Sequence, residues 1–382
     1  MIVNKKEYIT SLQGEKLMKS KDIYDTIIEK CTKDWYHSML IDLNKFWIAP
    51  KFSKKQIDKA GKTIASSDSS ADEQQKALEI LNNWRSSHAY PLQVITSNLR
   101  RNNPNAIVVQ RLKRLDSITG KLKRFPQMSL YRMQDLGGCR VIVNSIDEVY
   151  NSINKYKTSR IRHILKREND YIQNPKDSGY RSYHMIYQFH SDDKETYNKN
   201  MLIEIQIRTQ LQHIWATALE TMGIYTKTAL KASIGDKDIL RFFTLVSSVF
   251  AKIENMPICP NTSNSYDELI SEIREIDSKL NIVSRLSALS VAIKQTNENY
   301  SKGKGYYLLQ LNLSKRLLKI NKFSTTQIEL ATNIYDKIES LNNPYMDAVL
   351  VSAASFENLK AAYPNYFTDI SQFINTIQQI LK

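Results

Sequence analysis

The chain has 382 residues, which is enough for two or three domains and at least one sizeable core. Its hydrophobic content of 42% is typical of a globular protein, and no run of apolar residues is long enough to predict a membrane-spanning helix. We therefore expect a cytoplasmic protein with no membrane contact. Cys31, Cys139 and Cys259 are widely separated in the sequence, so neither a disulfide framework nor a C-x-x-C zinc site is indicated.

Positive charge is concentrated in one stretch of the chain. Lys and Arg number 54 against 39 Asp and Glu, for a net charge of +15. Residues 100–130 contain eight Lys and Arg against one acidic residue, so almost half of the excess lies there. Such a concentration indicates a polyanionic ligand, and both nucleic acid and a nucleoside triphosphate qualify.

Residues 1–90 are predicted to form a helical N-terminal extension. Within it, residues 1–48 read as helical and residues 49–72 as a polar, serine-rich loop. A helix is expected from Ala71 to Ser87. We place the domain boundary at Tyr90-Pro91.

Residues 91–220 are predicted to be a domain of alternating strands and helices. Ile107–Lys123 has the apolar spacing of an amphipathic helix that Pro126 ends. Asp135 is expected where a helix end passes through two glycines into a strand. Further helices are predicted at 146–156 and 210–220, further strands at 183–189 and 201–209, and a strand or helix at 159–166. We interpret His213 and Trp215 as packing residues.

The loop Tyr171–His184 combines glycine, proline, cations and tyrosines. Lys176, Arg181 and His184 could contact phosphate oxygens, and Tyr180 offers an aromatic face to a nucleobase. The alternative is a solvated loop with surface cations.

The segment Met201–Thr209 alternates with a period of two and predicts a strand with isoleucines on its buried face. Its other face carries Glu204, Gln206 and Arg208 in a row, which suggests a polar cleft; a solvent-facing edge is the alternative. Asp135 and Glu204 on adjacent elements are a usual way to hold Mg²⁺ against nucleotide phosphates, because the ion needs only one or two carboxylates. Singly, each acid could instead be a cap or an ion-pair partner.

The last third of the chain has no evident catalytic cluster. Residues 221–300 are predicted to be a helical connector, and residues 301–382 a small α/β module, because the hydrophobic period changes near Gly305. Elements are expected at 236–254, 266–299, 306–313, 316–323, 325–341, 348–353 and 356–381. We expect the module to restrain the active cleft or receive a regulatory partner; a structural role or a homo-oligomer interface is the alternative. Tyr363–Phe367 is a candidate surface, with packed aromatic rings as the alternative.

Three ordered motifs resemble the RelA/SpoT family of alarmone synthetases. D-x-x-G-x-R is met by Asp135, Gly138 and Arg140. P-K-x-x-G-Y-R-S-x-H is met by Pro175 through His184, and E-I-Q-I-R-T by Glu204 through Thr209. No histidine is followed by aspartate, so the chain lacks the His-Asp pair of the family's hydrolase domain and resembles the single-function branch.

The resemblance implies a nucleotidyltransferase-like α/β fold, a mixed sheet flanked by helices. It implies Mg²⁺-dependent transfer of pyrophosphate from ATP to the 3′-hydroxyl of GDP or GTP. The catalytic and metal-binding residues it implies are Asp135 and Glu204. The ATP-binding residues it implies are Arg111, Lys113, Arg114 and Arg140. The acceptor-binding residues it implies are Lys176, Tyr180, Arg181, His184, Gln206 and Arg208.

Other functions stay open at this point. Some small relatives are toxins that pyrophosphorylate the tRNA 3′ end or make adenosine alarmones, and these could require an antitoxin partner. A non-catalytic nucleic-acid-binding module would also explain the basic stretch, although such a module has no use for two acids near a polyanion.

Overall fold

The computed structural model describes residues 47–226, 230, 235–290, 294–295, 305–312, 317–340, 346–353, 355, 358–359 and 370–382. Nearly all of the predicted helical segment 1–48, and the candidate surface Tyr363–Phe367, lie outside the described residues.

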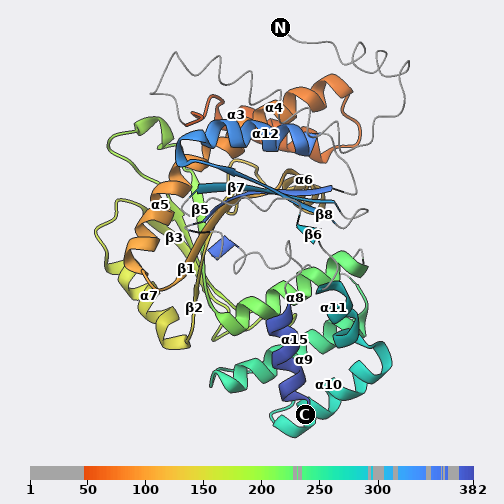
Figure 1. The fold of residues 1–382 in the computed structure, drawn as a ribbon. Helices are drawn as coiled ribbons and strands as arrows, with labels where there is room; N and C mark the ends of the chain where they lie inside the picture. The colour runs from red at the N-terminus through yellow and green to blue at the C-terminus, as the bar shows by residue number, and fades with distance from the viewer. Residues whose placement is uncertain are drawn as a thin grey trace.

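The strands of the described residues form one mixed sheet, in the order β3-β4-β5-β2-β1-β9-β7-β8-β6 (Figure 1). Their bounds are β1 Ile107–Leu112, β2 Gly137–Val143, β3 Ile164–Asp170, β4 Tyr183–Gln188, β5 Leu202–Thr209, β6 Lys294–Gln295, β7 Gly305–Asn312, β8 Leu317–Phe323 and β9 Met346–Ala353. β2 runs parallel to β5 and antiparallel to β1, and β4 runs antiparallel to β5. The predicted mixed sheet flanked by helices is confirmed.

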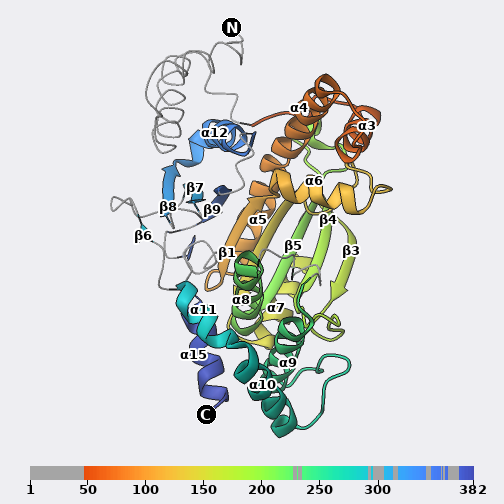
Figure 2. The same cartoon turned by 90° about the vertical axis from the view of Figure 1, so that its right-hand side faces the viewer.

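The helices gather at the two ends of this sheet and along it. Their bounds are α3 Lys54–Ala65, α4 Ala71–Ser87, α5 Ala89–Asn102, α6 Leu115–Arg124, α7 Ile146–Thr158, α8 Gln210–Thr226, α9 Lys237–Ile253, α10 Tyr266–Leu280, α11 Ile282–Ser290, α12 Ile328–Ser340 and α15 Ser371–Ile380, with 3₁₀ turns at η1 Glu195–Tyr197 and η3 Thr325–Gln327. Figure 2 shows α3, α4 and α12 at one end and α8, α9, α10, α11 and α15 at the other. Within the described part of the chain, each helix is too short or too polar to cross a bilayer.

The predicted helix over Ile107–Lys123 is wrong, because its first third is strand β1 and the helix α6 begins at Leu115. Ile107, Val108 and Val109 are β-branched and favour a strand. β1 pairs along its length with β2, from Ile107 opposite Ile142 to Leu112 opposite Gly137. The apolar spacing was real, but its buried residues belong to two elements.

The predicted loop over residues 49–72 is also wrong, because it contains α3. Ser53 begins this helix with a capping box, in which its side chain accepts from the Gln56 amide and the Gln56 side chain accepts from the Ser53 amide. Ile57 and Ile64 form the buried face of α3. The predicted helix Ala71–Ser87 is confirmed as α4, which has a capping box of its own.

The main apolar core lies between the sheet and the helices α3 to α7. All three isoleucines of β5, at positions 203, 205 and 207, are fully buried in it, which confirms the predicted apolar face of this strand. A second core joins α8, α9, α10, α11 and α15. On the other face of β5, Glu204 and Gln206 are half-buried.

The C-terminal strands continue the same sheet. β9 pairs with β1 at Ser352 opposite Gln110 and Val351 opposite Arg111. In addition, both carboxylate oxygens of Glu339 on α12 accept from the first amide of α6, at Leu115, at 3.3 and 3.2 Å. The predicted module 301–382 therefore contacts the predicted domain 91–220 directly, while the domain division and the regulatory role stay predictions.

Candidate functional site

A cavity of about 240 Å³ lies across the strands β1, β2, β5 and β4. It is lined by Arg111, Lys113, Asp135, Gly138, Cys139, Arg140, Lys176, Ser178, Tyr180, His184, Glu204 and Gln206. The strand register brings the polar residues together, because Gly138 lies opposite Glu204 and Gln206 lies between Arg140 and His184. Nine of the twelve predicted site residues line this cavity, and Arg114, Arg181 and Arg208 do not.

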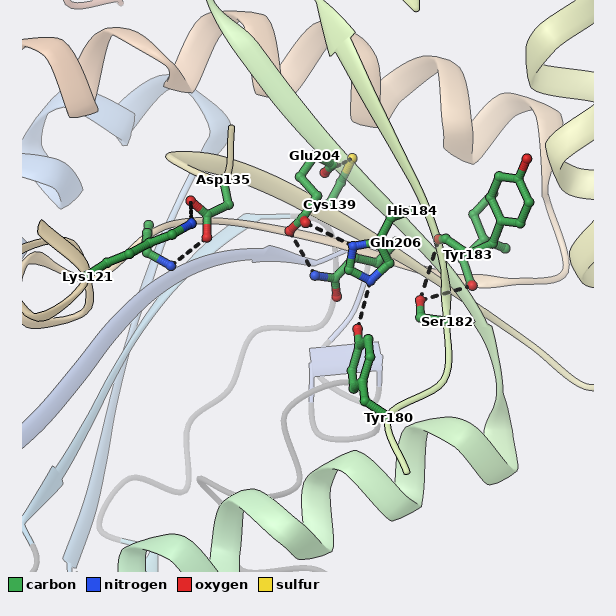
Figure 3. A network of polar contacts seen from close by, with 11 residues as sticks. Lys121, Asp135, Cys139, Tyr180, Ser182, Tyr183, His184, Glu204 and Gln206 are labelled. Carbon is green, nitrogen blue, oxygen red and sulfur yellow. Dashed lines mark hydrogen bonds and ion pairs between the residues drawn. The ribbon is translucent and has the colours of Figure 1, made fainter. Parts of the chain in front are cut away.

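Glu204 is the end of a chain of hydrogen bonds that starts at Tyr180 (Figure 3). The Tyr180 hydroxyl lies 2.8 Å from His184 Nε2, and His184 Nδ1 lies 3.0 Å from Glu204 Oε1. Gln206 Nε2 donates to the other carboxylate oxygen at 2.8 Å. Because an ionised carboxylate only accepts, the proton of this contact lies on His184 Nδ1, which donates to Glu204.

The Glu204 carboxyl is sheltered but kept ionised. Burial raises its pKa, whereas the hydrogen bond and charge of His184 lower it, and the net pKa lies below its usual value. The nearby charge of Asp135 opposes ionisation and shows that the two carboxylates are close enough to repel each other.

Asp135 lies just before β2 and has two cationic partners. Lys113 Nζ lies 2.7 Å from Oδ2. Lys121 Nζ lies 3.1 Å from Oδ1 (Figure 3). Burial raises the pKa of Asp135, but Lys113 and Lys121 outweigh this effect and the pKa is lowered. Sequence reasoning missed Lys121 as a site residue; its place in the basic stretch 100–130 was the available signal.

Gly179 gives the loop between β3 and β4 its shape. Its φ of +85° lies in the left-handed region, and a Cβ there would be 3.0 Å from both Trp215 and Ser247. Only glycine lets this loop pack against α8 and α9, which places Lys176 and Tyr180 at the cavity. Trp215 donates to the Phe243 carbonyl at 2.7 Å and packs in the core, as predicted.

Arg181 points away from the cavity. Its guanidinium donates to Ser247 Oγ at 3.0 Å, to the Ile172 carbonyl at 3.1 Å and to Cys259 Sγ at 3.6 Å, and the residue is 3% exposed. These contacts join the loop to α9. Arg181 therefore holds the loop against α9 in this structure, whereas its position in the motif had suggested contact with phosphate.

Arg208 and Arg114 also lie outside the cavity walls. Arg208 is buried beneath the site, where Nη2 contacts His213 Nδ1 and Nε has no hydrogen-bond partner. Burial and the charge of Arg140 lower the pKa of Arg208 to about 9. Tyr180 and Glu220 act in the opposite direction on this pKa but do not outweigh burial and Arg140. Arg114 is the N-cap residue of α6.

The cavity also contains a thiol. Burial raises the pKa of Cys139 to about 12, so this group stays protonated and is a poor nucleophile at neutral pH. The chemistry of the cavity therefore rests on its carboxylates and cations.

The side chains of the cavity fit Mg²⁺ only when a bound ligand supplies further oxygen atoms. The described residues contain no cluster of three or more His, Cys, Asp or Glu side chains that could hold a metal. Asp135 and Glu204 supply two carboxylates to one cavity. Mg²⁺ needs only one or two carboxylates when waters and phosphate oxygens complete its coordination. The residues present thus fit a nucleotide-bound Mg²⁺ and do not form a cage of protein ligands alone.

Comparison with known proteins identifies the segment that holds this cavity. Residues 110–229 match the family model described as "Region found in RelA / SpoT proteins". These residues are similar to that family and are called the RelA/SpoT region below. Every residue that lines the cavity lies within it.

The RelA/SpoT region is similar to two relatives from Bacillus subtilis (strain 168). GTP pyrophosphokinase YjbM is 34% identical over 119 residues, which are 30% of this chain and 54% of the relative. GTP pyrophosphokinase YwaC is 34% identical over 122 residues, 30% of this chain and 56% of the relative. The chain thus spans about half the length of these two curated relatives.

Two solved structures are also similar to parts of the chain. The small alarmone synthetase 1 from Bacillus subtilis, bound to its product pppGpp, is 21% identical with a TM-score of 0.37, covering 45% of this chain and 93% of that one. A GTP pyrophosphokinase family protein from Streptococcus pneumoniae is 24% identical with a TM-score of 0.37, covering 55% and 97%.

Proposed function

We propose that the protein is a pyrophosphokinase that transfers pyrophosphate from ATP to the 3′-hydroxyl of GDP or GTP. The observation that carries the proposal is the pair of ionised carboxylates, Asp135 and Glu204, that face one cation-lined cavity inside the RelA/SpoT region. The relatives' names as GTP pyrophosphokinases support the same reaction class.

The charge of the cavity supports a polyanionic substrate. Four cationic residues line it, Arg111, Lys113, Arg140 and Lys176, against two carboxylates. The buried Arg208 adds further positive charge behind the wall. Phosphate oxygens entering the cavity would accept charge-assisted hydrogen bonds from these groups and relieve their mutual repulsion.

Glu204 is the residue placed to accept the proton of the attacking hydroxyl. His184 and Gln206 hold its two oxygens, and its lowered pKa keeps it ionised at neutral pH. As the ribose 3′-oxygen forms its bond to the β-phosphorus of ATP, the bond from that phosphorus to the α,β-bridging oxygen breaks. AMP leaves with the electron pair, and the proton passes to Glu204.

The remaining residues position the two substrates. Arg111, Lys113 and Arg140 would bind the donor's phosphates, and Lys176 those of the acceptor. His184, which the sequence had placed among the acceptor-binding residues, instead contacts Glu204 and Tyr180 through its two ring nitrogens. The half-buried Tyr180 would stack on the acceptor's base. Asp135 and Glu204 are the residues that would hold Mg²⁺, which when bound neutralises charge on the transferred phosphates.

The test uses the purified full-length protein, ATP labelled in its γ-phosphate, and GDP, GTP, ATP or tRNA as acceptor. We expect labelled product with GDP or GTP, dependence on added Mg²⁺, and no product from Glu204→Gln. If the label enters only tRNA or only an adenosine nucleotide, that molecule is the acceptor and the proposed acceptor is wrong. No transfer to any acceptor would refute the proposed reaction.

A further inference from the structure

Both oxygens of the Asp135 carboxylate are occupied by lysine. Lys113 reaches one oxygen from the end of β1, and Lys121 reaches the other from the last turn of α6. The three side chains are only 20 to 27% exposed, so solvent screens these contacts less than it screens an ordinary surface ion pair. The pairing therefore affects what else Asp135 can bind.

This arrangement conflicts with metal binding at Asp135 in the absence of a nucleotide. A divalent cation bound to either oxygen would lie next to two ammonium groups, and the like charges would repel strongly in this sheltered site. At least one lysine has to leave before Asp135 can become a metal ligand.

Lys121 is better placed than Lys113 to leave. The backbone at Lys113 is fixed on both sides, because its amide donates to the Leu136 carbonyl at 2.8 Å and its carbonyl accepts from Arg85 Nε at 2.8 Å. Lys121 makes the longer contact with Asp135 and is the more exposed of the two lysines. It also lies near the end of its helix, where a long side chain can turn towards a ligand in the cavity.

We propose that Lys121 blocks the metal-binding oxygen of Asp135 until a nucleoside triphosphate binds, and that the phosphates then draw Lys121 away and open Asp135 to a divalent cation. The proposal deepens the proposed function, since it takes the donor to be a metal-bound nucleotide. Phosphate oxygens accept from ammonium as a carboxylate does, so Lys121 exchanges one anionic partner for another. Nucleotide and metal then strengthen each other's binding by the same factor.

The first test measures Mn²⁺ binding to the full-length protein without nucleotide, from the EPR signal of free Mn²⁺. Lys121→Met removes the ammonium and keeps an unbranched side chain. We expect it to bind Mn²⁺ at least tenfold more tightly than the wild type. The matched control is Lys123→Met, which removes the same charge from an exposed position of the same helix and should change the affinity less than twofold.

Two further variants locate the effect. Adding Asp135→Asn to Lys121→Met should abolish the gain, because the freed oxygen is then no longer charged. In the wild type, Mn²⁺ should raise the affinity for the unreactive α,β-methylene analogue of ATP, and Lys121→Met should reduce this coupling. Thermal denaturation of each variant verifies that it is folded.

Equal nucleotide-free Mn²⁺ affinity of folded Lys121→Met and wild type would overturn the proposal, as would a gain that survives Asp135→Asn. If Lys121 has only a structural role, the Lys121→Met variant should have a lower Tm than the wild type and no gain in Mn²⁺ binding. That result would also contradict the proposal. These measurements use no acceptor, so they can succeed even if the acceptor assay fails. Failure of the Lys121 proposal can therefore be distinguished from failure of the proposed function.

Discussion

The two carboxylates of the cavity have different kinds of partner. Asp135 contacts two ammonium groups, Lys113 and Lys121. Glu204 contacts the imidazole of His184 and the amide of Gln206. Burial raises the pKa of both carboxyls, and the partners lower it. At Asp135 the pKa is lowered mainly by the positive charge of the two lysines. At Glu204 it is lowered by the hydrogen bond from His184 and by the charge of His184.

The difference separates two tasks. A carboxylate paired with two ammonium groups stays ionised and is a poor proton acceptor, which suits a metal ligand once one of the lysines has left. A carboxylate held by an imidazole and an amide stays ionised and can still accept a proton, which suits a base. The comparison therefore predicts a larger chemical role for Glu204 and a binding role for Asp135.

Glu204→Gln should produce the largest effect. It removes the proton acceptor while preserving the shape of the side chain, and we expect kcat to fall by about 10²–10⁴ with no change in the fold. Steady-state kinetics and circular dichroism measure both quantities. The control is Glu195→Gln at an exposed position. Activity within about tenfold of wild type, roughly 1.4 kcal/mol of barrier, would remove Glu204 from the chemistry.

Asp135→Asn should lower kcat/KM by about 10²-fold, within the range for loss of a charged contact to a metal or phosphate. Unlike the Glu204 defect, this one should be partly restored by raised Mg²⁺, because the fault is binding. A metal titration of both variants makes the comparison. Equal rescue of the two variants, or of neither, would mean that the two carboxylates share one role.

Tyr180→Ala should raise KM for the acceptor about 5–150-fold and leave KM for ATP nearly unchanged, since base stacking contributes about 1–3 kcal/mol. Tyr180→Phe keeps the ring and loses only the hydrogen bond to His184, so its acceptor KM should stay near the wild-type value. If both substrates are affected alike, the tyrosine lies elsewhere than in the acceptor site.

His184→Ala should reduce kcat by about tenfold, the effect expected for one hydrogen bond to a charged group. Because His184 lowers the pKa of Glu204, its removal should move the acid limb of the pH–rate profile upward. The sign follows from the base: activity requires ionised Glu204 and is lost as pH falls through its pKa. His184→Asn, which can still donate, should restore part of the shift; an unmoved acid limb would contradict this role.

Arg181→Lys should have the smallest effect on activity and a clear effect on stability. Lysine cannot reproduce the contacts to Ser247, Ile172 and Cys259, and the loss should cost about 1.5–3 kcal/mol of unfolding free energy. Denaturant unfolding measures it, with the exposed Arg274→Lys as control. A large rise in the KM for the acceptor, with unchanged stability, would instead indicate that Arg181 binds the acceptor's phosphates.

Glu204 and its strand show what the sequence by itself determined. The alternation of isoleucine with polar residues over 202–209 is a local pattern of period two, and it fixed both the strand and the face that carries Glu204 and Gln206. The family resemblance of the three motifs likewise implied one site for Asp135, Lys176 and His184, and the structure brings them to one cavity. Contiguous residues within a regular element have directions that follow from the chain alone.

Only the tertiary structure decided the features that depend on distant partners. Ile107–Leu112 is a strand because β2 and β9 supply its hydrogen bonds, and no local periodicity reveals those neighbours. Arg181 points into the core because α9 packs against its loop and offers Ser247. Lys121 contacts Asp135 because the segment between α6 and β2 brings Asp135 back to the helix. In each case a side chain's direction is set by long-range packing, which residue order alone does not specify.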